Sequence, residues 1–331
     1  MITFGETERN LARLEVVRAV SAIPGADRVE RVTIDGWNVV AAKGEFTPGS
    51  YVVYFEIDAC LPMSDHRFSF LAKHGTKSQF GDLYHRLKTK RLCNVYSQGL
   101  ILPAVLFADE LERPEPLVKT LGIGKWEDEL PVGTNIIGPF SHMVSKTDSE
   151  RIQNLVDVWD DIAAVEWVAT EKIDGTSQTL LNNDGIHLYS RNYEIELDES
   201  QAGGKVATAF AVNLPAGHGV QYELAGPSIQ GNPLKLTQAQ GFIFSYLIGR
   251  TAVPMDQWPQ WALDSAVPVL MYDLTIGPDL LLSKVDGMLS MVNPMVLGEG
   301  VVFHTADGSI VPVLGRNTFK VISNKYLGKG R

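Results

Sequence analysis

The chain alternates apolar and polar side chains in short runs from Leu14 to Pro62, with turn-forming dipeptides between the runs. The runs occupy residues 29–34, 37–42 and 51–55, and the dipeptides are Pro24-Gly25, Asp35-Gly36 and Pro48-Gly49. A period of two places every second side chain on the same face of a strand. Asp-Gly and Pro-Gly favour the tight turns that join antiparallel strands. The pattern therefore predicts several short strands closed into a small β-barrel, and more than one type of β-barrel fits it.

A lysine, a carboxylate and a glycine stand within one turn of the chain at Lys172, Asp174 and Gly175. A lysine can act as a nucleophile when its amine is neutral at the moment of attack, which neighbouring cations favour. A glycine has no Cβ, so a nucleotide can come close to its backbone. Taken alone, residues 172–175 also fit a surface lysine beside an Asp-Gly turn.

Five further segments follow in order, at residues 190–192, 221–226, 242–244, 298–303 and 319–323. With residues 172–175 they resemble motifs I, Ia, III, IIIa, IV and V of the covalent nucleotidyltransferase superfamily, which contains ATP-dependent nucleic-acid ligases and RNA capping enzymes. The resemblance covers the C-terminal half of the chain. Within the superfamily the chain most closely resembles the nick-sealing RNA ligases that carry an N-terminal OB module, often called the fifth RNA ligase family.

The resemblance implies that Lys172 attacks the α-phosphorus of ATP, expels pyrophosphate and becomes a lysyl-adenylate. It also implies a set of catalytic residues and a set of nucleotide contacts. The catalytic residues are Lys172, Asp174 and Lys320. The nucleotide contacts are Arg151, Glu171, Gly175, Arg191, Glu223, Phe242, Lys320 and Lys325.

Three acidic residues, Asp174, Glu223 and Glu299, are each flanked by apolar residues or glycine, as at strand ends that line one pocket. Carboxylates gathered in this way predict a site for Mg²⁺, with Mn²⁺ as a substitute. Because Mg²⁺ keeps several waters, these groups can hold it directly or through water. Each glutamate alone would fit a surface charge at a strand end, but the order of the three matches the superfamily.

Two cations are expected at the phosphates of ATP. Arg191 and Lys320 would stabilise the charge of the polyphosphate, and a solvated salt bridge is the alternative role for Arg191. Related ligases often have a second motif V lysine two positions after the first, but that position is Ile322 here. The next lysine, Lys325, would have to reach the site from a following turn.

The adenine base and an upstream arginine complete the expected site. Adenine needs a flat apolar contact, which Phe242 or Phe244 can give, although either can instead belong to the core. The resemblance favours Phe242. Arg151 precedes motif I at the distance where related ligases place a phosphate-contacting arginine, and the first turn of a helix is the alternative for this segment.

The order of the modules sets the expected architecture. The resemblance implies an α+β protein, with an OB-like barrel at residues 1–145 and a nucleotidyltransferase domain of antiparallel sheets and flanking helices at residues 146–331. Eight residues follow motif V, too few for a second barrel. Cations gather in a basic loop at residues 83–92, where Lys88, Lys90 and Arg91 are predicted to contact RNA phosphates. A solvated charged face is the alternative.

This arrangement implies an ATP-dependent RNA ligase that joins 3′-OH and 5′-phosphate ends through a lysyl-AMP and a 5′-adenylylated polynucleotide. The expected substrate is nicked or broken RNA with RNA on the 3′-OH side, and the need for a template strand stays open. One alternative is a GTP-dependent capping-type guanylyltransferase, which the lack of an OB module after motif V disfavours. The other is a non-catalytic OB-fold RNA-binding protein, which intact Lys172, Glu223 and Glu299 disfavour.

Composition limits the partners and the compartment. A formal net charge of −10 argues against indiscriminate nucleic-acid binding and favours a local basic track. Two cysteines, Cys60 and Cys93, are too few for a disulfide framework or a zinc site, which indicates a reducing compartment. No apolar run approaches the ~20 residues that span a bilayer. We expect a monomer without membrane contact, in the cytoplasm or, for a viral protein, in the host cytoplasm.

Overall fold

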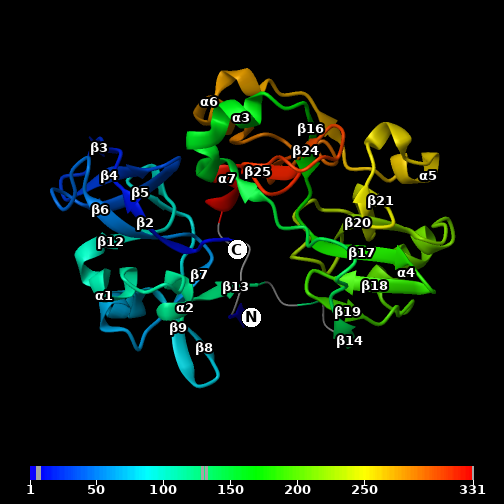
Figure 1. The fold of residues 1–331 in the computed structure, drawn as a ribbon, viewed down its shortest axis with the longest axis horizontal. Coiled ribbons are helices and arrows are strands. Elements are labelled where there is room, and N and C mark those ends of the chain that lie inside the picture. Colours follow the sequence, from blue (N-terminus) through cyan, green and yellow to red (C-terminus); the bar gives the residue numbers. More distant parts are fainter. Residues whose placement is uncertain (5–8, 128–129, 131–132, 330–331) are drawn as a thin grey trace. The chain divides into compact units, whose positions relative to one another are not determined.

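The computed structural model describes residues 1–4, 9–127, 130 and 133–329, and the chain forms two compact units (Figure 1). The first unit comprises residues 1–129 with residues 327–331, and the second comprises residues 130–326. The sequence predicts a boundary between residues 145 and 146 instead. The difference arises because β14 (Ile136–Pro139) pairs with β19 (Tyr193–Ile195), so this segment is a strand of the second unit.

The first unit contains two three-stranded antiparallel sheets that share one apolar core. β2 pairs with β6 and β6 with β12, while β3 pairs with β4 and β4 with β5. The chain passes from β2 directly into β3, and on the other side the Gln98 backbone N–H donates to the Asn38 carbonyl oxygen, 2.8 Å away. These strands are β2 (Ala12–Val16), β3 (Ala19–Ala22), β4 (Val29–Ile34), β5 (Trp37–Ala42), β6 (Tyr51–Phe55) and β12 (Leu100–Pro103).

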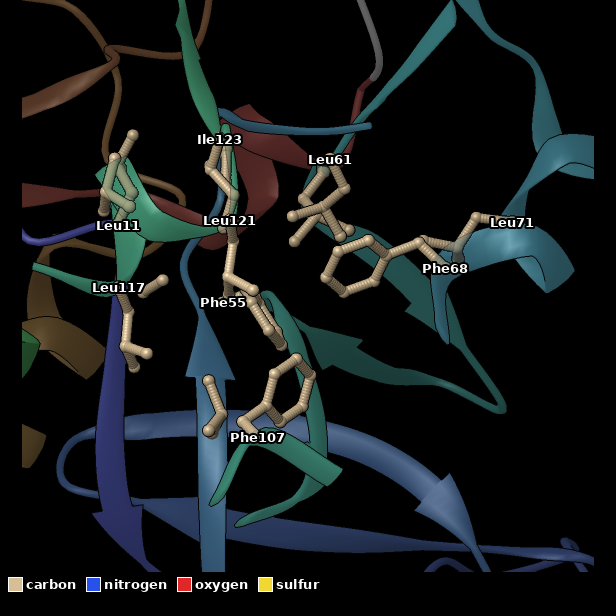
Figure 2. Close-up of a cluster of buried hydrophobic side chains, with 14 residues drawn as sticks. Leu11, Phe55, Leu61, Phe68, Leu71, Phe107, Leu117, Leu121 and Ile123 are labelled. Atoms are coloured by element: carbon tan, nitrogen blue, oxygen red, sulfur yellow. The ribbon is translucent and has the colours of Figure 1, made fainter. Parts of the chain in front are cut away.

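Alternation along β6 separates two apolar cores. Val52 and Tyr54 belong to the cluster that the barrel strands enclose, whereas Phe55 belongs to a second cluster (Figure 2). In that second cluster Phe55 packs edge-on against Phe68, with ring centroids 5.2 Å apart, and also contacts Phe107. The period of two in the sequence thus fills both sides of one strand with buried side chains.

A five-stranded antiparallel sheet, a hairpin and short helices complete the first unit. The sheet has the order β1-β13-β7-β9-β8, and β10 pairs with β11 in the hairpin. The strands are β1 (Ile2–Thr3), β7 (Ala59–Pro62), β8 (Lys77–Gln79), β9 (Asp82–Arg86), β10 (Lys90–Leu92), β11 (Val95–Ser97) and β13 (Gly124–Trp126). The helices are η1 (His66–His74), η2 (Ala104–Phe107), α1 (Ala108–Leu111) and α2 (Leu117–Thr120).

The larger sheet of the second unit has seven antiparallel strands in the order β14-β19-β18-β17-β20-β21-β22. Its further strands are β17 (Thr176–Asn182), β18 (Ile186–Ser190), β20 (His218–Ala225), β21 (Gln240–Ile248) and β22 (Thr251–Ala252). The associated helices are α4 (Ala202–Ala211), η4 (Met255–Gln257) and α5 (Gln260–Leu263). Phe210 of α4 packs edge-on against Tyr222 of β20 at 5.0 Å, so α4 covers one face of this sheet.

The smaller sheet has the order β15-β25-β24-β16-β23, with β15 parallel to β25 and the other pairs antiparallel. Its strands are β15 (Glu150–Arg151), β16 (Trp167–Lys172), β23 (Val269–Leu270), β24 (Gly300–Thr305) and β25 (Thr318–Ile322). The helices are η3 (Ile152–Val158), α3 (Trp159–Ala163), η5 (Leu274–Ile276), α6 (Pro278–Val285) and α7 (Asn324–Leu327). Phe303 and Phe319 stack at 4.6 Å in the core between this sheet and η3, α3 and α6.

The predicted α+β class, with antiparallel sheets and flanking helices in the second unit, is confirmed. No helix among the described residues is long and apolar enough to cross a membrane. The two sheets of the second unit are joined directly at residues 173–175, between the end of β16 and the start of β17. That junction contains the predicted nucleophile motif.

Candidate active site at the junction of two sheets

Lys172 is the last residue of β16 and pairs with Gly300, the first residue of β24. Glu299 directly precedes β24, so the register of the two strands brings it beside Lys172. The Lys172 Nζ donates a hydrogen bond to Glu299 Oε2 at 2.8 Å, and both side chains are partly buried. Two residues that lie far apart in the sequence therefore form one ion pair at the strand ends.

Glu223 brings a second carboxylate to the same place from the larger sheet. It lies on β20, opposite Ser177 of β17. Burial raises the pKa of the Glu223 carboxyl to about 7, the charge of Lys172 opposes this rise, and the charge of Glu299 adds to it. The site therefore holds two mutually repelling carboxylates whose charge Lys172 partly offsets.

Gly175 is required because the backbone of β20 comes close to it. A Cβ at this position would lie 2.2 Å from the Leu224 carbonyl oxygen and 3.2 Å from Glu223 Cγ. The Gly175 backbone N–H also bonds the Glu223 carboxylate. The Leu224 carbonyl occupies the space that a Cβ would take, so the close approach of the two strands already requires a glycine here. The approach of a nucleotide to the Gly175 backbone stays a prediction.

Asp174 is buried and accepts a hydrogen bond from the Tyr326 hydroxyl of α7. Burial raises the pKa of Tyr326, and the nearby charge of Glu299 raises it further. Sequence reasoning missed this tyrosine, because a single aromatic residue after motif V gives no signal of its own. The contact ties the segment after β25 to the lysine motif.

The three predicted metal ligands do not form a compact ligand shell. Among the described residues, no three or more His, Cys, Asp or Glu side chains gather closely enough to hold a metal ion. Glu223 and Glu299 lie near Lys172, whereas Asp174 bonds Tyr326. Direct and water-mediated metal binding both stay open as predictions.

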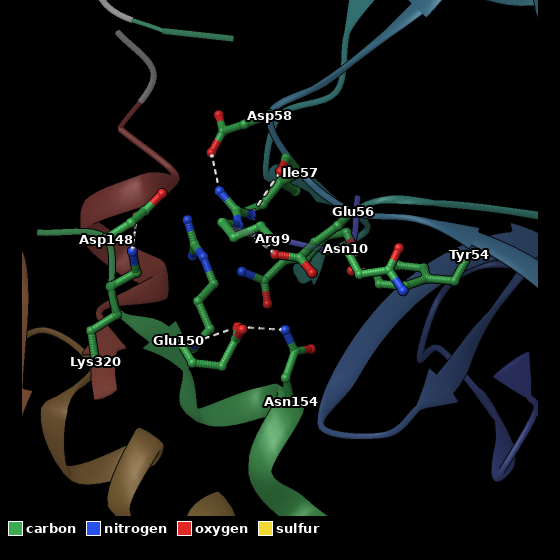
Figure 3. Close-up of polar contacts among 12 residues, drawn as sticks. Arg9, Asn10, Tyr54, Glu56, Ile57, Asp58, Asp148, Glu150, Asn154 and Lys320 are labelled. Atoms are coloured by element: carbon green, nitrogen blue, oxygen red, sulfur yellow. Dashed lines mark hydrogen bonds and ion pairs between the residues drawn. The ribbon is translucent and has the colours of Figure 1, made fainter. Parts of the chain in front are cut away.

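Three basic residues, Arg151, Arg191 and Lys320, lie around β25 and Asp148. Arg151 of β15 is the register partner of Lys320 of β25, and both are buried. Asp148 is also buried, and its carboxylate lies 3.2 Å from Lys320 Nζ (Figure 3). The same carboxylate lies 2.8 Å from Arg191 Nη2. The structure thus places Arg151 on a strand, immediately before η3, rather than in a helical turn.

Asp148 is a site residue that sequence reasoning missed. It lies in a polar stretch that reads as a connection between domains, and a single aspartate there carries no signal. Its carboxylate contacts two cations from distant parts of the chain, Arg191, which follows β18, and Lys320 of β25. Asp148 therefore fixes the positions of two cations that the sequence assigns to phosphate binding.

Glu171 and Phe242 are both buried close to Lys172 in the sequence or in space, since Glu171 precedes Lys172 and Phe242 shares an apolar cluster with Ile173. Glu171 is 1% exposed, and its Oε2 accepts from the Met291 backbone N–H at 2.9 Å. Its other oxygen, Oε1, has no hydrogen-bond partner among the described residues, and burial raises the pKa of this carboxyl. Phe242 packs in an apolar cluster with Ile173, and the partly buried Phe244 packs against the same cluster.

Lys325 lies in a different environment from Lys320. Its backbone N–H donates to Asp286 at 2.7 Å, and its exposed side chain passes over Gly287, where Nζ lies 2.9 Å from the position a Cβ would take. These contacts tie Lys325 to the turn after α6, and Lys320 is the motif V lysine that reaches Asp148.

The basic loop predicted at residues 83–92 is instead formed largely by strands of the first unit, β9 and β10. Lys88, Lys90 and Arg91 are exposed, and Arg91 lies over the Tyr96 ring at 5.9 Å. Arg86 differs from them because it pairs with Asp58 at 2.8 Å. The exposed cations are therefore presented by a β-hairpin and the residues just before it.

Comparison with known proteins covers both units. A family model described as an OB-fold domain matches residues 11–104, and one described as RNA ligase matches residues 165–322. No curated protein sequence matches the chain. These matches confirm the predicted OB module and the predicted resemblance to RNA ligases.

Solved structures of the Naegleria gruberi RNA ligase are similar to the whole chain. A mutant form with ATP and manganese is 31% identical with a TM-score of 0.84, and covers 97% of this chain and 99% of that chain. A mutant form with AMP and manganese is 30% identical with a TM-score of 0.85 and the same two coverages. The form with pyrophosphate is 31% identical with a TM-score of 0.83, over 96% of this chain and 98% of that chain.

Proposed function

The chain belongs to the RNA ligase family, and we propose that Lys172 is the residue through which it uses ATP to join RNA ends. The observation that carries this proposal is the Lys172–Glu299 contact of 2.8 Å at the junction of the two sheets. It places a lysine amine beside a proton acceptor, with a second carboxylate close by.

The reaction has three steps. Lys172 Nζ forms a bond to the α-phosphorus of ATP while the bond to the β-phosphate oxygen breaks and pyrophosphate leaves. An oxygen of the RNA 5′-phosphate then attacks the phosphorus of the lysyl-AMP and regenerates the lysine. Finally the RNA 3′-OH attacks the activated 5′-phosphorus, which forms the phosphodiester and releases AMP.

Each charged residue has a separate role in the first step. The Lys172 ammonium must lose a proton before attack, and Glu299 is its hydrogen-bond acceptor. Arg191, Lys320 and Arg151 stabilise the phosphates, with Asp148 holding the first two in position. The all-oxygen donor set of Glu223 and Glu299 fits Mg²⁺ or Mn²⁺, which when bound offsets the charge of the carboxylates and the phosphates.

The nucleotide base is recognised by Glu171 and the apolar cluster that contains Phe242. Glu171 Oε1 is a buried acceptor with no described partner, which suits the exocyclic amine of adenine. Guanine presents a carbonyl oxygen at the same ring position, and two acceptors repel. This difference favours ATP over GTP.

Neither alternative function is favoured, because the family model over the second unit and the similar structures are those of RNA ligases. The OB-fold unit and the ligase unit together indicate nucleic-acid binding. We propose that the substrate is a nick in duplexed RNA with RNA on the 3′-OH side. Lys88, Lys90 and Arg91 would contact its phosphates.

A panel of nicked duplexes, with RNA or DNA on each side of the nick, tests this proposal with ATP or GTP as the nucleotide. We expect sealing with ATP and little with GTP, and the best rate with RNA at the 3′-OH side. Lys172→Ala should fail on 5′-phosphate nicks but still seal a pre-adenylated nick, because the last step does not use the lysyl-AMP. Sealing by Lys172→Ala with ATP, or equal use of GTP, would contradict the proposal.

A further inference from the structure

The hairpin that joins β8 to β9 has an unusual residue at its tip. Gln79 pairs with Asp82, so the loop has two residues, Phe80 and Gly81, with positive φ of 54° and 89°. This turn type favours Asn-Gly, because asparagine and glycine adopt a left-handed backbone readily. A bulky aromatic residue rarely does. Backbone preference therefore does not explain Phe80.

Packing does not explain Phe80 either. Its side chain is 88% exposed, and Leu83, on the same hairpin, is also exposed. An aromatic ring in water gains none of the free energy that burial gives. A strained and exposed aromatic residue at a defined position suggests that something else contacts the ring.

The hairpin is held in a fixed place within the first unit. The Gln79 amide bonds the backbone of Ile2 in both directions, accepting from its N–H at 2.7 Å and donating to its carbonyl oxygen at 2.6 Å. β9 also pairs with β7 in the five-stranded sheet. The ring of Phe80 is therefore presented from an anchored hairpin, which lowers the entropy lost on binding.

The charge around this hairpin is strongly positive. Residues 73–92 contain six lysines and arginines and one acidic residue, Asp82, in a chain whose net charge is −10. Lys73, at the end of η1, and Lys77, at the start of β8, are both exposed. A local excess of cations on an acidic protein fits a polyanion.

We propose that Phe80 stacks on an unpaired base where an RNA strand continues beyond the nicked duplex, and that the phosphates of that strand lie along the cations of residues 73–92. Cations that follow a backbone, together with an exposed aromatic ring, are the features by which proteins hold single-stranded nucleic acid. Stacking accepts any base, as a ligase that joins ends of varied sequence requires. The inference rests on the proposed function, since it takes RNA to be the substrate.

The test uses Phe80→Asn in the full chain, because asparagine suits the left-handed turn and should leave the fold intact. We expect its affinity for a fluorescently labelled single-stranded RNA to fall about 5- to 150-fold, the range for one lost base stack. Its melting temperature should equal or exceed that of the unchanged protein. Self-adenylation with ATP, which needs no RNA, should be unchanged.

A second variant, Phe80→Trp, measures stacking directly through tryptophan fluorescence. The fluorescence of the added indole should decrease when the RNA binds. Val105→Trp places a control tryptophan at a 78% exposed position of the same unit, and its fluorescence should not change. An unchanged RNA affinity in Phe80→Asn, or no quenching in Phe80→Trp, would overturn the proposal.

Two further outcomes are distinguishable. If sedimentation shows that Phe80→Asn dissociates an oligomer without losing RNA affinity, the hairpin contacts a second copy of this chain and the RNA proposal is wrong. If the unchanged protein fails to self-adenylate with ATP, the proposed function fails while the RNA-binding result still decides the role of Phe80.

Discussion

Gly175→Ala offers a sharp test of the junction between the two sheets. The new Cβ would lie 2.2 Å from the Leu224 carbonyl oxygen, whereas ordinary contacts begin at 3.4 Å, so the strands must separate by about 1 Å. That movement would also shift the Glu223 carboxylate, which the Gly175 N–H bonds. Overpacking of this kind costs about 1–3 kcal/mol of stability. A misplacement of about 1 Å near reacting groups can lower a rate by about 10²-fold.

The assay is the single-turnover rate of self-adenylation at saturating ATP, measured with the melting temperature. We expect a rate lowered by about 10²-fold and a reduced melting temperature. Gly138→Ala is the matched control, because its Cβ would meet the end of the Glu194 side chain at 3.1 Å, which can move aside. If Gly175→Ala adenylates as fast as the unchanged protein and melts at the same temperature, the close approach of the strands has no role in the site.

Three further predictions concern charge. Burial raises the pKa of the Glu223 carboxyl from 4.5 to about 7, so between these pH values the folded chain retains a proton that the unfolded chain has lost. The free energy of unfolding should therefore decrease as the pH rises from 4.5 to about 7. In the protein without ligand, Glu223→Gln should make the melting temperature decrease less over this pH range than it does in the unchanged protein. The same pH dependence in both proteins would contradict the raised pKa of Glu223. Asp148→Asn should lower the melting temperature but increase the stabilisation given by ATP, whose phosphates would replace the missing charge, and a smaller ATP shift would contradict this. Replacing Lys88, Lys90 and Arg91 with alanine should weaken the binding of nicked RNA. It should also reduce the slope of log affinity against log salt concentration by up to about one unit per lost contact. An equal slope in the variant and the unchanged protein would mean that these cations form a solvated surface without phosphate contacts.

The sequence predicts the strands of the first unit and the motif segments around Lys172 and Glu299, because these signals are local, but it does not predict the ion pair between the two. Alternation over a few residues marks β4, β5 and β6, and the segment containing Glu299 is recognisable beside its glycines. Strand register then brings Glu299 to Lys172. These features need no knowledge of distant contacts beyond the pairing of two strands.

Other parts of the site depend on tertiary contacts that no local pattern encodes. Asp148 lies in a connecting segment and Tyr326 in the short helix α7, and each acquires its role through a partner more than 40 residues away. The boundary expected at residues 145 and 146 relied on polar composition, which cannot reveal that β14 pairs with β19. The reason for Gly175 was likewise hidden until the position of the Leu224 carbonyl was known.

The most direct test of the account is to locate the AMP. The full chain is incubated with ATP and Mg²⁺ or Mn²⁺, and its peptides are mapped by mass spectrometry, with Lys172→Ala and Lys325→Ala treated in parallel. The account predicts one AMP, bound to Lys172 in the unchanged protein and in Lys325→Ala, and none in Lys172→Ala. AMP on another residue, or an adenylated Lys172→Ala protein, would contradict it.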